Sequence, residues 1–240
     1  MPIKNRLHNL SRLLRDFNFC NMAVDKEKYQ EINEELRLSK ITLVAVSKTK
    51  PVEDILELYD LGHRDFGENY VQELVEKAER LPKDIRWHFI GHLQSNKVKL
   101  ITPFIYLIHG VDSLKLLKEI DKQAEKSKRH IDCLLQVHIA QEETKFGFDE
   151  NELFALEIGQ FANVKIKGLM GMASLSEYVN KIRTEFKHLK TIYKKLSTLT
   201  PQLSILSMGM SADYKIAIEE GSNMVRIGSL LFGERNYESK

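Results

Sequence analysis

The run Ile41-Thr42-Leu43-Val44-Ala45-Val46-Ser47 is rich in aliphatic and β-branched residues and leads directly into Lys48. A short apolar run of this kind is typical of a strand buried on both faces of a parallel sheet. Residues 52–61, which follow, carry apolar side chains at helical spacing among acidic ones. The chain repeats this alternation to its end, which indicates a parallel sheet with crossover helices.

We count eight such units between residues 41 and 228, with strands expected at 41–47, 64–66, 86–90, 106–109, 132–139, 165–170, 203–207 and 224–227. Helices are expected between them, among others at 52–61, 113–128, 178–199 and 212–220. Eight successive units predict a single (β/α)8 TIM barrel of the α/β class. An open doubly wound sheet is the alternative, and it rarely needs eight units in succession.

No linker, low-complexity tract or strong internal repeat divides the chain, so residues 1–240 are expected to form one domain. Residues 1–40 are expected to be a helical segment that packs on the barrel, because apolar residues recur there at spacings of three and four: Ile3, Leu7, Leu10, Leu14 and Phe17. The basic residues near the N-terminus are also typical of an organelle transit peptide, but the apolar stripe favours a structural helix. Residues 229–240 leave room for one short helix.

Composition excludes several classes of protein. The 240 residues contain 36 Lys and Arg against 34 Asp and Glu, a net charge of +2 that argues against a surface dedicated to nucleic acid. No apolar run approaches the roughly 20 residues needed to cross a bilayer. With a mean hydropathy of −0.33, we expect a soluble protein. Cys20 and Cys133 are too few for a disulfide scaffold, which suggests the reducing cytoplasm.

Active sites of (β/α)8 barrels lie at the carboxyl ends of the strands, and Lys48 stands at the end of the first one. An amine at the mouth of an apolar barrel is partly desolvated, which favours its neutral, nucleophilic form and allows a Schiff base with an aldehyde. A lysine that merely extends into solvent is the alternative from position alone. Lys50 is a weaker candidate, because Pro51 is expected to begin the next helix.

The ends of the last two strands have the chemistry of a phosphate site. Ser211 is expected to cap the helix after strand seven. After strand eight, Gly228 allows close backbone approach and Ser229 places a hydroxyl at the start of the terminal helix. Loops at these two positions of a barrel commonly hold a phosphate. The alternative is that both loops merely cap helices. That would explain Ser211, but not why both loops carry phosphate-binding groups at the same end of the barrel.

An aldehyde-trapping lysine near a phosphate site points to a phosphorylated aldehyde, of which pyridoxal 5′-phosphate (PLP) is the obvious example. Four segments closely resemble the pyridoxal phosphate homeostasis proteins, the YggS/PROSC family. They are AVSKTKP at 45–51, FGENYVQE at 66–73, WHFIGHLQSNK at 87–97 and LSMGMS at 206–211. The resemblance extends over nearly the whole chain and favours a functional role for Lys48.

The resemblance implies a barrel like the N-terminal domain of alanine racemase, with PLP held as an internal aldimine on Lys48. Phosphate contacts would come from Ser211, Gly228 and Ser229. The family more often has threonine at the position of Ser229, but either hydroxyl can donate to phosphate. Arg226 would lie beside the pyridine nitrogen, where its fixed charge would discourage ring protonation and weaken the electron sink.

By the same motifs, Asn69 would lie near the cofactor ring, with Met208 and Met210 close by. Core filling is the more ordinary use of the two methionines. His92 would lie in a loop near the mouth of the site. Lys145 could affect transfer or regulation of the cofactor, and a solvent-facing loop lysine stays open as the alternative.

A metal site is the competing use of the histidines. His88 and His92 are four residues apart, and His109 and His138 stand at predicted strand ends. The segment around His88 is predicted to be a strand, in which residues four apart lie well separated. We therefore expect no metal, and a structural role for His88.

We expect a cytoplasmic PLP carrier that buffers or delivers the cofactor, influences amino-acid and keto-acid balance, and catalyses no sustained reaction. Racemisation needs acid–base groups on both faces of the substrate α-carbon, and alanine racemase takes one from a second domain that is not expected here. The second hypothesis is an amino-acid racemase of minor activity, and the third is an aldolase that uses a Schiff base. Expected partners are PLP and apo forms of PLP-dependent enzymes. A monomer is expected, with a symmetric interface as the open alternative.

Overall fold

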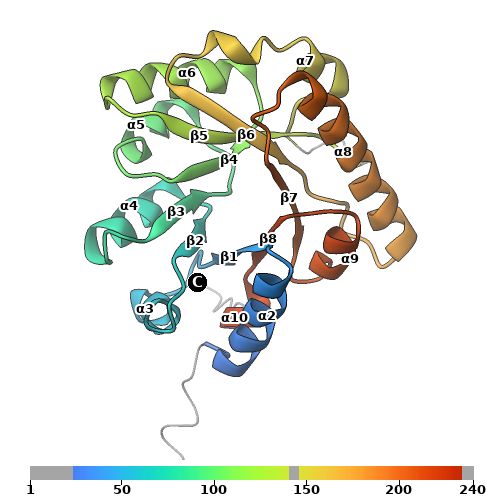
Figure 1. Ribbon diagram of the computed structural model, residues 1–240. Helices are drawn as coiled ribbons and strands as arrows, with labels where there is room; N and C mark the ends of the chain where they lie inside the picture. Colours follow the sequence, from blue (N-terminus) through green and yellow to red (C-terminus); the bar gives the residue numbers. More distant parts are fainter. Residues whose placement is uncertain (1–23, 141–145, 234–240) are drawn as a thin grey trace, which may run out of the picture.

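The computed structural model describes residues 24–140 and 146–233. Eight parallel strands close into a barrel in which each strand pairs with the next and β8 pairs with β1 (Figure 1). The strands are β1 (Thr42–Val46), β2 (Asp65–Glu68), β3 (Arg86–Phe89), β4 (Leu107–Val111), β5 (Ile131–Gln136), β6 (Val164–Met170), β7 (Ile205–Met210) and β8 (Met224–Ile227). Each predicted strand is present, so the predicted (β/α)8 barrel is confirmed.

Helices connect the strands and cover the outside of the barrel (Figure 1). They are α2 (Lys26–Leu38), α3 (Val52–Asp60), α4 (Val71–Arg80), α5 (Val98–Ile101), α6 (Leu114–Lys126), α7 (Glu150–Phe154), α8 (Val179–Leu199), α9 (Tyr214–Glu219) and α10 (Ser229–Phe232), with short 3-10 helices η1 (Ser95–Lys97) and η2 (Ile158–Gln160). The four helices predicted by range correspond to α3, α6, α8 and α9. Within the two described ranges, no helix combines the length and apolar character that a membrane crossing requires.

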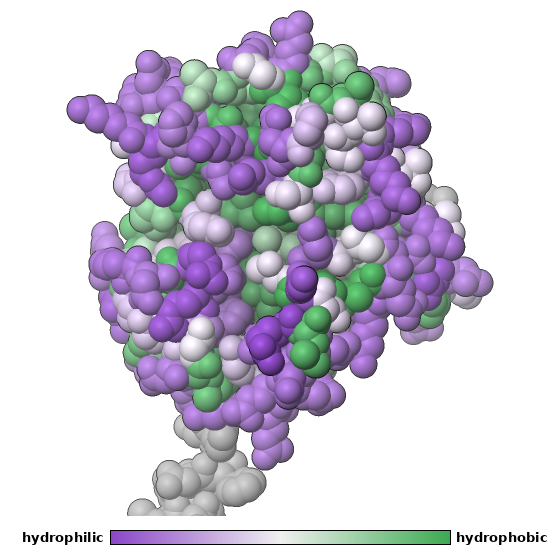
Figure 2. Space-filling view, in the orientation of Figure 1, coloured by the Kyte–Doolittle hydropathy of each residue, from purple (hydrophilic) through white to green (hydrophobic). Residues whose placement is uncertain are grey.

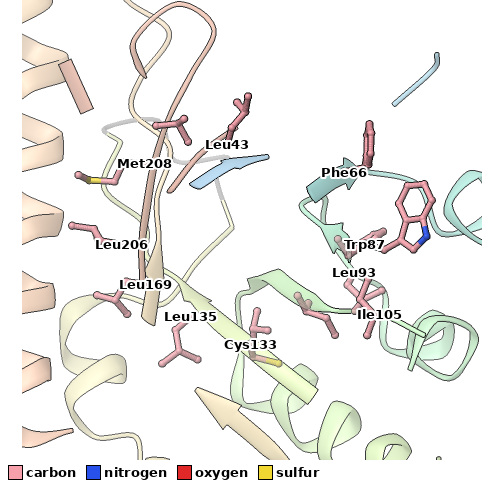
Figure 3. Close-up of a cluster of buried hydrophobic side chains, with 14 of the residues drawn as sticks. Leu43, Phe66, Trp87, Leu93, Ile105, Cys133, Leu135, Leu169, Leu206 and Met208 are labelled. Carbon is pink, nitrogen blue, oxygen red and sulfur yellow. The ribbon is translucent and has the colours of Figure 1, made fainter. Parts of the chain in front are cut away.

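The larger hydrophobic core lies between the barrel and its helices. It includes Phe66, Trp87, Leu206 and Met208, and Figure 3 shows Leu206 and Met208 extending from β7 toward the helical layer. On the face shown in Figure 2, hydrophilic side chains cover most of the surface, and hydrophobic ones show mainly in the recesses between elements. The outward-facing strand residues and the inward faces of the helices thus form this core together.

The inside of the barrel is filled differently, because alternate residues of each strand point to opposite faces. A small apolar cluster consists of Val44, Leu107, Leu134, Met170 and Met224. The barrel strands also carry buried polar side chains, namely His88, His109, Ser207 and Arg226. The barrel interior is therefore a packed core with a polar part.

Helix α2 takes the place that a long eighth helix would have. Asp25 caps it by accepting a hydrogen bond from the Lys28 N–H, and its buried face consists of Tyr29, Ile32 and Leu36. It packs against β1 and α10, which has only four residues (Figure 1). Helix α2 lies in the second half of the predicted N-terminal helical segment, whereas the apolar stripe of residues 3–17 lies outside the described residues, so the segment as a whole stays a prediction.

The contact between β6 and β7 requires a residue without a side chain at Gly168. Gly168 pairs with Ile205, and an added Cβ would lie 1.7 Å from the carbonyl oxygen of Ile205. Since both positions belong to the closed sheet, the strands would have to separate to admit a methyl group.

We therefore expect Gly168→Ala to lower the free energy of unfolding by about 3 kcal/mol, at the upper end of overpacking effects. Gly159→Ala is the matched control, since an added Cβ there meets nothing within 4 Å, and its effect should stay within about 0.5 kcal/mol. Urea unfolding of the two variants measures the difference. Equal stability of both would contradict the close approach of the strands.

His63 joins α2 to the barrel. Its Nε2 lies 2.8 Å from the carbonyl oxygen of Asp65, and its ring makes edge contacts with Tyr29 and Phe66. Burial lowers the pKa of His63 from 6.5 to about 4. The unfolded chain therefore binds a proton at this residue between these pH values while the folded protein does not, so stability decreases as the pH falls through this window.

For wild type, the His63 contribution is a loss of roughly 3 kcal/mol in the free energy of unfolding between pH 6.5 and about 4. We expect His63→Asn to reduce the pH dependence by this amount, and the exposed residue His130 to serve as a control when changed to Asn. Urea unfolding at a series of pH values is the measurement. An unchanged slope in His63→Asn would show that His63 titrates alike in both states.

Candidate functional site

A cavity of about 300 Å³ opens at the carboxyl ends of the strands, where the sequence places the functional residues. It is lined by Val46, Lys48, Lys50, Asn69, Ile90, Met172, Met210, Ser211, Ala212, Arg226, Gly228, Ser229 and Gly233. All the residues predicted to contact a cofactor are in this set. The structure therefore brings them together in one place, and their role toward a ligand stays a prediction.

The cavity is positively charged. Lys48, Lys50 and Arg226 line it, and no acidic residue is among its described lining residues. Apolar side chains such as Val46 and Ile90 complete the wall. A concave site with an apolar wall and a few convergent cations suits a small anionic ligand with an apolar body.

Lys48 lies in a tight turn that follows β1. The N–H of Lys50 donates to the carbonyl of Ser47 across this turn, and Thr49 adopts a left-handed conformation with φ 65°. The Thr49 N–H donates to Oε1 of Glu73 at 2.6 Å. Nζ of Lys50 donates to the carbonyl of Phe232 at 2.5 Å, which links the turn to the end of α10. Lys50 thus has a structural contact that its position in the sequence did not reveal.

A buried charged cluster lies directly behind this turn, between β1, β2 and α4. Nζ of Lys77 donates to Glu68 and to the Ser47 carbonyl at 2.8 Å each, and to Glu73 at 2.6 Å. The Ser47 hydroxyl donates to Glu68 at 2.6 Å. Burial raises the pKa of Glu68 to about 7, although the Lys77 charge acts in the opposite direction. The cluster holds the backbone on both sides of Lys48.

Sequence reasoning missed this cluster. Glu73 and Lys77 are four residues apart on α4, which is the spacing of an ion pair on one helix face, and that signal was available. The contacts of Lys77 with Glu68 and Ser47 could not be predicted from the sequence, because they depend on how α4 packs against two strands.

Arg226 is buried, yet it lines the cavity. One guanidinium nitrogen donates to the Ser207 carbonyl at 3.0 Å and to the Ser207 hydroxyl at 2.6 Å, and the other to the Gly171 carbonyl at 3.2 Å. Burial lowers the pKa of Arg226 to about 10. The side chain therefore stays cationic at neutral pH and is fixed by neutral oxygen atoms.

The loops after β7 and β8 meet at the other side of the cavity. The N–H of Gly228 donates to the Ser211 hydroxyl at 3.1 Å, and Ser229 is the first residue of α10. An added Cβ at Gly228 would lie 3.2 Å from the Val46 carbonyl oxygen, so the backbone approaches β1 closely. The hydroxyls and the N–H groups at the start of α10 face one region, as phosphate binding requires.

The expected capping role of Ser211 is wrong. Strand β7 continues to Met210, and the residue that precedes α9 is Asp213, whose carboxylate accepts the Met210 N–H at 2.6 Å. Ser211 instead accepts from Gly228, which joins the two loops. Since α10 has only four residues, its dipole is also small. Phosphate binding at this position would therefore depend more on individual hydrogen-bond donors than on the helix dipole.

Asn69 and the two methionines take different positions. Oδ1 of Asn69 is buried and has no hydrogen-bond partner among the described residues, and the side chain lines the cavity. Met210 is 39% exposed and lines it too, whereas Met208 is fully buried in the outer core. Core filling therefore holds for Met208 and not for Met210.

His92 lies in a neighbouring recess that shares Asn69 with the cavity. Its Nδ1 is 2.8 Å from a carboxylate oxygen of Asp112, and its ring stacks on Phe146. This agrees with the expected loop position near the mouth. Lys145 lies outside the described residues.

His88 is fully buried and hydrogen-bonded to His109 and Asp65, as expected of a structural side chain. His109 lies within β4 and not at its end, and His138 follows β5. No group of three or more His, Cys, Asp or Glu side chains in residues 24–140 and 146–233 is arranged to hold a metal ion.

Comparison with known proteins first defines the class. The family model for the alanine racemase N-terminal domain matches residues 26–236. With its closed eight-stranded barrel and the lysine at the end of β1, the chain is a member of this class of barrels.

Its relatives define the family more closely. The pyridoxal phosphate homeostasis protein of Vibrio alginolyticus is 43% identical over 205 residues, which are 82% of this chain and 88% of that protein. That of Aquifex aeolicus is 44% identical over 200 residues, 81% of this chain and 87% of that protein. The structure of PipY from Synechococcus elongatus with PLP bound matches with a TM-score of 0.80 and 36% identity, over 86% of this chain and 99% of that one. The chain belongs to the pyridoxal phosphate homeostasis protein family.

The buried cluster behind Lys48 leads to a stability prediction. Lys77→Met removes the cation from Glu68 and Glu73, and we expect a loss of about 3 kcal/mol in the free energy of unfolding, as for other broken buried ion pairs. Lys195→Met is the control, since Lys195 is 58% exposed in its pair with Glu150, and it should cost less than about 1 kcal/mol. Urea unfolding measures both. Similar values would mean that the cluster contributes no more than a surface pair.

Proposed function

We propose that this protein binds PLP in the cavity at the carboxyl end of its barrel and acts in PLP homeostasis as a carrier. The observation that carries the proposal is that the predicted cofactor residues, drawn from four separate segments of sequence, line one cavity with three cations and no acid among its described lining residues. PipY, at 36% identity, has PLP bound in its structure. When bound, PLP supplies an aldehyde that a lysine amine can capture and a ring that withdraws electrons.

Each side of the cavity suits one part of this ligand. Lys48 offers an amine on a turn fixed from behind by Glu73, where it can react with the aldehyde. Ser211 and Ser229 offer hydroxyl donors for the phosphate, and Gly228, which has no side chain, leaves room for it to approach the backbone. The unpartnered Oδ1 of Asn69 offers an acceptor for a hydroxyl of the ring.

Arg226 supports carriage more than catalysis. A buried guanidinium is a permanent donor, so beside the pyridine nitrogen it keeps that nitrogen unprotonated and weakens electron withdrawal by the ring. In addition, no Tyr, His, Cys or carboxylate is among the described lining residues, and racemisation needs a second acid–base group opposite the lysine. The relatives are named as homeostasis proteins.

The proposal includes a monomeric, cytoplasmic protein that passes PLP to apo forms of PLP-dependent enzymes. A carrier must release its ligand, and a cavity that opens at the mouth of the barrel suits release. Transfer to an added apo-enzyme, followed by the activity gained, tests this part.

Borohydride reduction of PLP-treated protein, followed by peptide mass mapping, tests the site. We expect a stable pyridoxyl adduct on Lys48 in wild type, and none at this site in Lys48→Ala. Lys50→Ala should retain the adduct on Lys48, because Lys50 contributes charge and a loop contact but not the reacting amine. Label only on other lysines in wild type would overturn the proposal.

Solvent deuterium exchange separates a carrier from a racemase. With a panel of amino acids in heavy water, we expect PLP release or complex formation but no continued incorporation of deuterium at the α-carbon. Alanine racemase is the positive control. Sustained incorporation at enzymatic rates, lost in Lys48→Ala, would establish the racemase instead.

A further inference from the structure

A chain of buried polar side chains crosses the interior of the barrel and ends at Arg226. The Ser207 hydroxyl, which accepts from Arg226 at 2.6 Å, lies 3.4 Å from Nδ1 of His109. Nε2 of His109 lies 2.9 Å from Nδ1 of His88, and Nε2 of His88 lies 3.0 Å from a carboxylate oxygen of Asp65. Every link is within hydrogen-bond distance, with the serine–histidine link the longest.

The chain passes through the barrel and not around its wall. Asp65, His88 and His109 lie on the neighbouring strands β2, β3 and β4, but Ser207 lies on β7, which does not pair with β4. The link from His109 to Ser207 therefore spans the barrel interior. Arg226 lines the candidate cofactor cavity at the carboxyl ends, whereas Asp65 lines a recess at the opposite end of the strands.

The direction of each hydrogen bond follows from the two ends. Both carboxylate oxygens of Asp65 accept from Arg86, which with His88 holds the pKa of Asp65 well below its usual range, so Asp65 is an anion that only accepts. His88 must then donate from Nε2, and we assign its Nδ1 as the acceptor toward His109. His109 donates from Nε2 in turn and accepts at Nδ1 from the Ser207 hydroxyl. Ser207 accepts from the guanidinium, which only donates.

With this assignment all donors point the same way, from a buried cation to a buried anion, and His109 is neutral. Burial and the neighbouring His88 and Arg226 lower the pKa of His109 well below its ordinary value, which agrees with this state. Aligned hydrogen bonds polarise one another. In every hydrogen bond of the chain, the acceptor lone pair points toward Arg226, so the chain presents a negative electrostatic potential to the guanidinium. The groups that accept hydrogen bonds from Arg226, on Ser207 and Gly171, are themselves uncharged.

We propose that Ser207, His109, His88 and Asp65 are positioning residues that hold Arg226 in one orientation at the cofactor cavity, with the Asp65 carboxylate fixing the far end of the chain. The functional consequence rests on the proposed PLP site, because Arg226 would tune the ring nitrogen there. Asp213, the acid whose charge raises the pKa of Arg226, accepts the Met210 N–H and makes no bond to the guanidinium. The chain from Asp65 is thus the bonded route between Arg226 and a carboxylate.

The first test needs no cofactor. Long-range ¹H–¹⁵N NMR of the cofactor-free protein at neutral pH should show His88 and His109 as neutral rings, each protonated on Nε2, with both assigned from His88→Gln and His109→Gln spectra. Protonation of either ring on Nδ1, or an imidazolium, would overturn the proposal. This result is independent of whether PLP binds.

The second test uses PLP-loaded protein. Arg226→Gln should shift the absorption maximum of bound PLP, and His109→Leu should shift it in the same direction and weaken PLP binding about tenfold, with Lys48 still labelled by borohydride. His63→Asn is the control, since the His63 ring contacts the backbone carbonyl of Asp65 and not the carboxylate that takes part in the chain. It should leave the spectrum unchanged.

A wild-type spectrum in His109→Leu, together with a shift in Arg226→Gln, would overturn the positioning role. If wild type takes up no PLP, the proposed function fails, and the NMR result alone decides whether the chain exists. Should His109→Leu fail to fold, Ser207→Ala interrupts the same chain next to Arg226 and carries the same expectation.

Discussion

Closure of the barrel between β1 and β8 is the constraint on which the site depends. Ala45 pairs with Phe66 on one side and with Ile227 on the other, so β1 has a partner along both edges. Because of this, the turn that carries Lys48 lies beside the loops after β7 and β8. In an open sheet with the strands in sequence order, the first and last strands would form opposite edges, and Lys48 and Arg226 could not line one cavity.

Much of this arrangement could be predicted from the sequence, because buried parallel strands appear as apolar runs and functional residues follow them. Lys48 and Ser229 were found by that rule alone. The capping role of Ser211 was predicted wrongly, since β7 is longer than its apolar run and Asp213 takes the position before α9. The link from His109 to Ser207 could not be predicted, as it joins strands that are not neighbours and depends on the register of the whole barrel.

Two buried polar systems support the cavity from different sides. Behind Lys48, Lys77 and two carboxylates fix a turn that contains a left-handed residue, Thr49. Inside the barrel, two buried histidines and Ser207 connect Arg226 to Asp65. Both place charge where an apolar core would be more usual, and both hold a cation-bearing element at the cavity. The cavity wall is thus held in place by side chains behind it as well as by those that line it.

The most direct measurement is a crystal structure of the protein soaked with PLP. We expect continuous electron density from Nζ of Lys48 to the cofactor, with the phosphate at Ser211, Gly228 and Ser229 and the guanidinium of Arg226 beside the ring nitrogen. Cofactor density elsewhere on the protein, with an unmodified Lys48 and an empty cavity, would contradict the assignment of this cavity as the PLP site.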